Sequence, residues 1–173
     1  MVFDRAPLDP VRWDDNAVRL IDQRRLPGEL VYWHCRTVEE VAEAIRTLAV
    51  RGAPAIGIAA AFGVALGARI AEAAGKDPLA AAREASALLR TTRPTAVNLF
   101  WAVDRINRVI DAKEKAPDTL FNALLAESEA ILEEDLATGA AIAEHGLSLF
   151  PQGEARVLTH CNAGGLATSG WGT

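Results

Sequence analysis

Cysteine is scarce in this sequence of 173 residues, which contains only Cys35 and Cys161. The two lie far apart and form neither a CxxC pair nor a Cys/His spacing of the kind that binds zinc. The sequence therefore indicates no disulfide framework and no metal centre. This low cysteine content fits a reducing compartment, and we therefore expect a cytoplasmic protein.

An excess of basic charge is also missing. The chain has 18 Lys and Arg against 23 Asp and Glu, a net charge of −5, and its arginines are scattered along the sequence. Without a basic stripe, nothing indicates binding to nucleic acid or to a membrane surface, and small molecules or proteins are the expected partners. The opening MVFDRAPLDPVRW holds no apolar segment typical of a secretory signal, so we expect the mature chain to begin near Met1.

Charged residues are absent from the stretch between Gly52 and Ala68. This run is just shorter than the ~20 residues that span a membrane. It is rich in alanine and glycine, and amphipathic segments flank it in the sequence. We therefore expect a helix buried in the core of a helical domain, in which Gly63 and Gly67 allow close approach of a neighbour.

Ahead of this run, the sequence predicts a small sheet and a helix. Residues 17–35 are typical of a β-hairpin with Pro27 and Gly28 at the centre of a type II turn. Alternation along the second strand directs Cys35 into the core. Next, Thr37 and Glu40 form a capping box at the start of a helix. We expect this helix to end at Gly52 and to bury a stripe of Val38, Val41, Ile45 and Leu48.

Three further helices are predicted after the apolar run. Pro54 and Pro94 are each expected in the first turn of a helix. One predicted helix begins at Pro78, and the last extends from about residue 120 to 150, with a bend at Gly139. The helix after Pro94 has an inner face formed by Leu99, Val103, Ile106 and Ile110. Beyond them, RVLTHC predicts a short strand, so that a new domain begins near Ala155.

Three loops, RGAPAIG, TTRPTAV and CNAGGLAT, lead the chain into the start of a helix, where unpaired N–H groups favour an anion. In the first loop Arg51 offers a guanidinium fork, and Gly52 exposes bare backbone to a ligand. Alternatively, this loop only connects two helices, with a glycine that ends the first and a proline in the first turn of the second. Arg93 likewise has two interpretations, as a partner for an anion or as a solvated surface arginine.

Cys161 falls where the predicted strand gives way to a glycine-rich turn, the point at which α/β sheets bind ligands. A thiolate there could act as base, acid or nucleophile. His160 is its neighbour on the strand and points to the opposite face, so a direct dyad is not expected. The alternative is a small buried residue beneath the turn. Neither GxGxxG nor a Walker-type lysine is present, so nucleotide cofactors are not indicated.

Taken together, VRGAPAIG, TRPTAVNLFWA and LTHCNAGGLAT resemble the methylthioribose-1-phosphate isomerase family of methionine salvage, in this order and spacing, and the resemblance extends over the whole chain. It implies an α+β fold of two domains. Residues 1–154 would form a small antiparallel sheet and a helical bundle. Residues 155–173 would supply the first strand and helix start of a Rossmann-like domain that is otherwise missing from this sequence.

The resemblance also implies a site and a reaction. Arg51, Gly52, Ala53 and Arg93 would bind a phosphosugar, and Cys161 would be the catalytic cysteine. The proton donor would be an aspartate beyond Thr173, so that this chain alone is inactive. No metal or organic cofactor is implied, and the full-length protein would be a homodimer. The reaction would convert 5-methylthioribose 1-phosphate to 5-methylthioribulose 1-phosphate. The alternatives are a ribose-1,5-bisphosphate isomerase and a non-catalytic regulatory subunit of the initiation factor 2B type.

Overall fold

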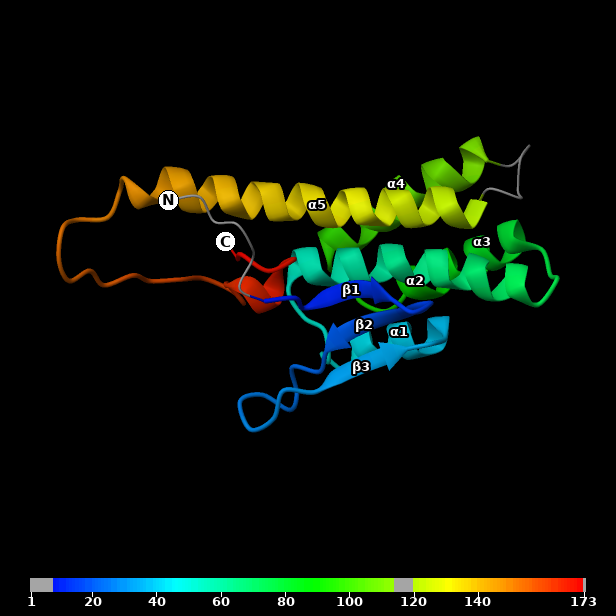
Figure 1. Cartoon of the computed structure of the whole chain (residues 1–173), viewed down its shortest axis with the longest axis horizontal. Coiled ribbons are helices and arrows are strands. Elements are labelled where there is room, and N and C mark those ends of the chain that lie inside the picture. The colour runs from blue at the N-terminus through cyan, green and yellow to red at the C-terminus, as the bar shows by residue number, and fades with distance from the viewer. Residues whose placement is uncertain (1–7, 114–119, 173) are drawn as a thin grey trace.

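The structure is a computed structural model that describes residues 8–113 and 120–172. A three-stranded sheet comes first and helices follow (Figure 1). The strands are β1 (Val11–Asp14), β2 (Ala17–Ile21) and β3 (Tyr32–Cys35). The helices are α1 (Val38–Arg46), α2 (Ala53–Ala73), α3 (Pro78–Arg90), α4 (Val97–Ala112) and α5 (Leu120–Leu147), and a short 3-10 turn, η2, spans Gly165–Ala167. The predicted combination of a small antiparallel sheet with a helical bundle is confirmed.

The predicted hairpin is formed by β2 and β3, whose antiparallel register pairs Val18 with Cys35. Sequence analysis missed β1, which pairs with the other edge of β2 in the order β1-β2-β3. Asp15 and Asn16 connect β1 to β2, and both have positive φ (46° and 55°), as a two-residue type I′ turn requires. Aspartate and asparagine tolerate this conformation well, so the DN pair was the signal for the missed hairpin.

The type II turn predicted at Pro27 and Gly28 is wrong. Gly28 does not have the positive φ that the third position of such a turn demands. Instead, the Glu29 N–H donates to the Arg25 carbonyl (3.1 Å), within a longer connection that the Asp22 N–H closes onto the Val31 carbonyl (2.9 Å). Within this connection Arg24 pairs with Asp22 and Arg25 pairs with Glu29, both at 2.7 Å.

Helix α1 begins as predicted and ends early. The Glu40 N–H donates to Thr37 Oγ1 (3.2 Å), and Glu40 Oε2 accepts from the Thr37 N–H (3.1 Å), which confirms the capping box. The helix ends at Arg46 rather than at Gly52. Leu48, which was expected in the buried stripe, has φ 62° and is 41% exposed. This left-handed residue turns the chain so that Ala49, rather than Leu48, enters the core.

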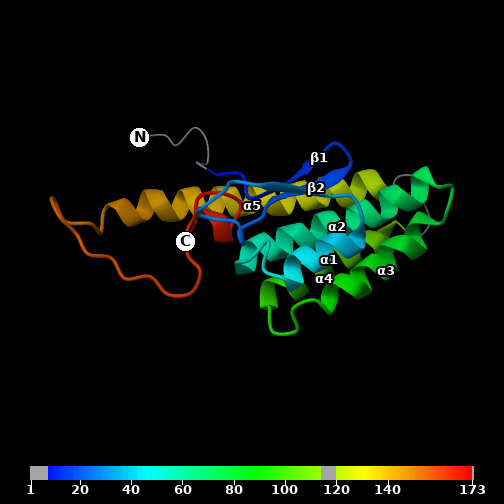
Figure 2. The same cartoon turned by 90° about the horizontal axis from the view of Figure 1, so that it is seen from below.

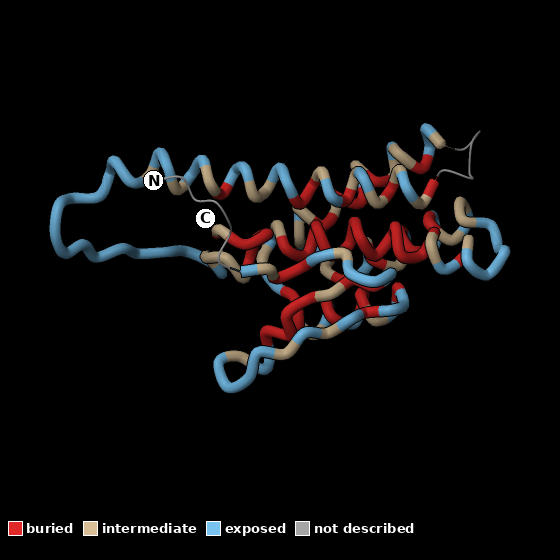
Figure 3. The backbone as a smooth tube through the Cα atoms, in the orientation of Figure 1, coloured by how far each residue is buried: buried red, intermediate tan, exposed pale blue. Residues whose placement is uncertain are grey.

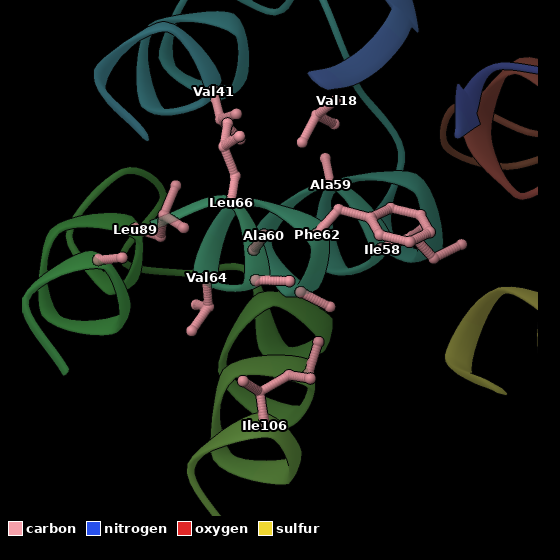
Figure 4. Close-up of a cluster of buried hydrophobic side chains, with 14 of the residues drawn as sticks. Val18, Val41, Ile58, Ala59, Ala60, Phe62, Val64, Leu66, Leu89 and Ile106 are labelled. Carbon is pink, nitrogen blue, oxygen red and sulfur yellow. The ribbon is translucent and has the colours of Figure 1, made fainter. Parts of the chain in front are cut away.

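Helix α2 is the buried centre of the molecule, as predicted. It is long and apolar enough to cross a membrane by length and composition, but 78% of its apolar window is buried inside the protein. The buried residues concentrate around it in Figure 3. Figure 4 shows side chains from β2, α1, α3 and α4 converging on this helix, namely Val18, Val41, Leu89 and Ile106.

Two glycines of α2 allow α3 to pack closely against it, as predicted. A Cβ atom added to Gly63 would lie 2.8 Å from Leu89 Cδ1, and one added to Gly67 would lie 2.9 Å from Ala85 Cβ. Both distances are shorter than van der Waals contact, so a larger residue at either position would require a neighbouring side chain or α3 itself to shift.

The later helices follow the predicted pattern except at one start. Leu99, Val103, Ile106 and Ile110 are all fully buried along α4. Pro94, however, lies ahead of this helix, in a turn that the Ala96 N–H closes onto the Arg93 carbonyl (3.1 Å). Helix α5 continues without interruption through Gly139. Figures 1 and 2 show that its second half extends beyond the other helices, and that the following segment returns to the start of α2.

The strand predicted for RVLTHC is wrong for this structure. Residues 156–161 are irregular and exposed, and Leu158 is 98% exposed. A strand forms only when its backbone N–H and C=O groups pair with a neighbouring strand. The described residues place no other strand beside this segment. The predicted division at residue 154 stays a prediction.

Candidate functional site

The first turn of α2 is in direct contact with the glycine-rich segment near the end of the chain. Gly52 is the N-cap residue of α2, with φ 107° and no side-chain cap. A Cβ atom at Gly52 would lie 2.3 Å from the Ala167 Cα. Only glycine allows this backbone conformation together with so close an approach. We call residues 164–172 the glycine turn, and the loop before α2 that holds Arg51 and Gly52 the Arg51 loop.

A buried glutamine joins the same two segments. Gln23 follows β2 and is only 3% exposed. Its Nε2 donates to the Leu166 carbonyl (2.8 Å), and its Oε1 accepts from Arg51 Nε (3.2 Å). Its backbone N–H donates to the Ala49 carbonyl (2.9 Å), just ahead of the Arg51 loop. Gln23 therefore contacts both segments at once.

Helix α5 holds the other side of the glycine turn. Asp135 Oδ2 accepts hydrogen bonds from the Ser169 N–H and the Ser169 hydroxyl, both at 2.7 Å. Within the turn, Thr168 Oγ1 accepts from the N–H groups of Gly170 (3.2 Å) and Gly172 (3.0 Å). The missing side chain of Gly139 makes room for Trp171, since a Cβ atom there would lie 2.8 Å from the Trp171 Cβ. The turn is thus fixed between α2 and α5.

A cavity of about 390 Å³ opens beside these contacts. It is bounded by the first turns of α2 and α4 and by the middle of α5. Both helices begin without a side-chain cap and without an acidic residue in the first turn. Helix starts of this kind favour a bound anion. Its lining residues are Pro54, Gly57, Ile58, Val97, Asn98, Trp101, Ile131, Glu134, Asp135 and Thr138.

The two carboxylates in the lining are already engaged within the protein. Glu134 pairs with Arg105 of α4 through two oxygens (2.5 and 2.8 Å), and the hydrogen bonds from this guanidinium lower the pKa of Glu134. Asp135 holds the Ser169 backbone and hydroxyl. The remaining wall of the cavity is mainly apolar, from Ile58, Val97, Trp101 and Ile131.

None of the predicted site residues is among the residues that line the cavity. Arg51 and Ala53 are exposed, and Arg93 is half-buried. The Arg93 side chain makes no hydrogen bond or ion pair with the residues that the structure describes. Cys161 has φ 60° and is exposed, three residues ahead of the glycine turn, so the alternative of a small buried residue is wrong. The structure joins the Arg51 loop to the glycine turn, and the functional roles stay predictions.

Cys35 contrasts with Cys161. It is fully buried in the sheet, as predicted, and burial raises the pKa of its thiol to about 12.

Sequence analysis missed Gln23, Asp135 and Ser169. Only Gln23 carried a signal, as a polar residue two positions after the end of a largely apolar strand, whereas Asp135 is one of several acidic residues on a long helix.

Comparison with known proteins identifies the family. The profile of the initiation factor 2 subunit family matches residues 49–169, which is more than half of the chain. The chain belongs to the initiation factor 2 subunit family. Among relatives of the family, a methylthioribose-1-phosphate isomerase of Geobacter sulfurreducens is 52% identical over 165 residues, covering 94% of this chain and 47% of the relative.

Solved structures of the family show the same fold. The 5-methylthioribose 1-phosphate isomerase of Pyrococcus horikoshii superimposes with a TM-score of 0.86 at 40% identity, over 97% of this chain and 48% of that one. The delta subunit of translation initiation factor eIF-2B from A. fulgidus gives a TM-score of 0.80 at 41% identity, over 95% of this chain and 48% of that one. The chain spans about half the length of the relatives it matches.

Proposed function

We propose that this chain forms the phosphosugar-binding half of an isomerase that converts 5-methylthioribose 1-phosphate to 5-methylthioribulose 1-phosphate. The observation that carries the proposal is a pair of uncapped helix starts, each preceded by an arginine, that open on one cavity beside the glycine turn. Similarity to proteins named methylthioribose-1-phosphate isomerase supports the substrate.

In this proposal the substrate phosphate lies at the helix starts. Arg51 uses its Nε to contact Gln23, and its remaining guanidinium donors have no partner among the described residues. Together with Arg93 and the backbone at Gly52 and Ala53, they supply charge-assisted hydrogen bonds to phosphate oxygens. Holding the phosphate fixes the position of the reacting carbons, which lowers the entropic part of the barrier.

The chemistry begins with ring opening. The phosphate occupies the anomeric oxygen, so the furanose ring does not open spontaneously, and an acid must protonate the ring oxygen as its bond to C1 breaks. The hydrogen on C2 then moves to C1 while the C2 hydroxyl loses its proton and becomes a carbonyl. Cys161 serves as the base of an enediol route or stabilises a hydride shift. The resemblance assigns the acid to an aspartate beyond Thr173.

We further infer that residues 155–173 begin a Rossmann-like domain. The sequence RVLTHC has the composition of a strand, and its side chains, Val157 and Leu158 among them, are exposed in the irregular segment. A neighbouring parallel strand would give its backbone the missing partners. The relatives are about twice as long as this chain, which is consistent with such a domain. We also propose that the full-length protein is a homodimer and is located in the cytoplasm.

The cavity favours the methylthio sugar over ribose 1,5-bisphosphate. A methylthio group is apolar, and Ile58, Val97, Trp101 and Ile131 provide an apolar wall. A second phosphate would instead meet this wall and the carboxylates of Glu134 and Asp135. The role of a regulatory subunit has no comparable support from the geometry.

Binding and turnover test the proposal separately. Calorimetric titration of the chain with 5-methylthioribose 1-phosphate should give saturable binding that inorganic phosphate competes away. Turnover is measured in a chimera in which the chain replaces the matching part of the Geobacter sulfurreducens relative, with the ketose detected by NMR. We expect kcat/KM to be at least about tenfold higher for the methylthio sugar than for ribose 1,5-bisphosphate.

In the same chimera, Cys161→Ser should lower kcat by about 100-fold or more and leave the melting temperature nearly unchanged, because serine has almost the same shape as cysteine. Near-normal turnover would remove Cys161 from the mechanism. A preference for ribose 1,5-bisphosphate would reassign the substrate, and binding without turnover in the wild-type chimera would favour a regulatory role.

A further inference from the structure

The side chain of Gln23 lies where the Arg51 loop meets the glycine turn. Its amide uses both of its functional atoms, since Nε2 donates to the Leu166 carbonyl (2.8 Å) and Oε1 accepts from Arg51 Nε (3.2 Å). Gln23 is 3% exposed, which limits the access of water to its amide, and both bonds are partly buried. Leu166 belongs to the segment that directly follows Cys161, and Arg51 directly precedes α2.

Few side chains can replace this amide. A donor and an acceptor on one planar group are special to glutamine and asparagine. Glutamate would keep an acceptor for Arg51 but would set an oxygen against the Leu166 carbonyl. Leucine would fill a similar volume and lose both bonds, leaving the Leu166 carbonyl without this partner in a partly buried position.

We propose that Gln23 is a positioning residue that fixes the Arg51 guanidinium and the glycine turn relative to each other, so that the loops of the phosphosugar site stay assembled before substrate arrives. This inference rests on the proposed function. An exposed arginine otherwise samples many rotamers, and ordering it on binding reduces affinity. Anchoring Nε fixes the plane of the guanidinium and leaves its terminal N–H groups for a ligand.

The glycine turn has a second attachment that does not involve Gln23. Asp135 holds Ser169 from α5, and Ala167 packs on the backbone of Gly52. Loss of the Gln23 amide should therefore loosen one side of the turn without unfolding it. This separation makes the role of Gln23 measurable in a folded protein.

The first arm of the test is hydrogen exchange of the glycine turn. Gln23→Leu and Gln23→Glu both remove the donor to the Leu166 carbonyl, so the amides of residues 165–170 should exchange about tenfold faster than in the wild-type chain. The matched control is Ser86→Ala, which removes one bond between a 4% exposed hydroxyl and Asn107 (2.7 Å), away from both loops. Unchanged exchange in the turn of Gln23→Leu would overturn the proposal.

The second arm is affinity for 5-methylthioribose 1-phosphate, measured by calorimetry on the same proteins. Gln23→Leu should raise the Kd about tenfold. Gln23→Glu keeps the acceptor for Arg51 and should raise it less. Ser86→Ala should leave the Kd unchanged. Equal effects of the leucine and glutamate variants would contradict a role exerted through Arg51.

A double-mutant cycle separates positioning from general destabilisation. If Gln23 acts through Arg51, Gln23→Leu should have little further effect on the Kd in an Arg51→Ala background. Additive losses would overturn the proposal. Absence of any binding by the wild-type chain would overturn the proposed function and, with it, the role of Gln23 toward a ligand. The exchange arm would still decide whether Gln23 holds the turn.

Discussion

At the scale of single residues, the two cysteines occupy opposite environments. Cys35 is fully buried, and its thiol pKa is raised to about 12 by burial, whereas Cys161 is exposed. Alkylation requires the thiolate, which Cys35 forms only near its raised pKa. We expect iodoacetamide at pH 8 to modify Cys161 alone, as measured by peptide mass spectrometry. Labelling of Cys35 below pH 9 in the folded protein would contradict this assignment.

Arg93 offers a test of the phosphate site. Its side chain is half-buried and has no partner among the described residues, so its removal breaks no described hydrogen bond or ion pair. Arg93→Ala should weaken binding of 5-methylthioribose 1-phosphate by about tenfold to 100-fold and leave the free energy of unfolding within about 0.5 kcal/mol of the wild type. Calorimetry and urea denaturation measure the two quantities. Unchanged affinity would exclude Arg93 from the site.

Gly52 should be the most restrictive glycine of the site. It combines φ 107° with a would-be Cβ only 2.3 Å from the Ala167 Cα. Gly52→Ala should lower the free energy of unfolding by more than about 2 kcal/mol, since backbone strain and a clash add together. Gly75→Ala is the matched control, because Gly75 has φ 66° with no atom near its would-be Cβ. Gly75→Ala should lower the free energy of unfolding by only about 1 kcal/mol. An equal loss in the two variants would refute the close approach at Gly52.

Residues with local partners were predictable, and residues with distant partners were not. The capping box of Thr37 and Glu40 involves positions three apart, and alternation along a strand is enough to bury Cys35. The bonds of Gln23 reach across 28 residues to Arg51 and across 143 residues to Leu166. No periodicity or local motif encodes such separations, so this part of the candidate site required the structure.

At the scale of elements, the packing of α2 on α3 depends on small residues. Gly63→Ala would place a Cβ atom 2.8 Å from Leu89 Cδ1 and should destabilise the protein by about 1–3 kcal/mol, despite the better helix propensity of alanine. Gly146→Ala is the control, since no atom lies near that position on α5, and it should be neutral or stabilising. Thermal denaturation of both variants measures the difference. Stabilisation by Gly63→Ala would show that α3 yields without cost.

The helices were more predictable than the strands and turns. Periodicity, capping residues and prolines located all five described helices, because each signal is local to the helix it forms. The strand predicted for RVLTHC did not form, since strand pairing requires a partner elsewhere in the chain. Pro94 was misplaced for a different reason, because a local turn at Arg93 delays the start of α4 to Val97.

At the scale of the whole molecule, the sheet and the helices share one core. Phe62 is 1% exposed on α2, and its ring centroid lies 6.3 Å from that of Trp13 on β1. Phe62→Ala should lower the free energy of unfolding by about 3–5 kcal/mol. We expect the amides of β2 and α4 to lose protection together in hydrogen exchange, because both elements pack on α2. If the amides of β2 and α4 lost protection independently, the sheet and the helices would be two cooperative units.

The bond between Gln23 and Leu166 has a consequence for biosynthesis. A ribosome releases β2 early, while the acceptor of the Gln23 amide is still 143 residues from synthesis. The sheet and the helices can therefore collapse around this amide before its partner exists, and the glycine turn docks afterwards. A nascent chain halted before residue 166 would hold an unsatisfied amide group beside the Arg51 loop, which makes synthesis past Leu166 a condition for assembling the contacts of that loop.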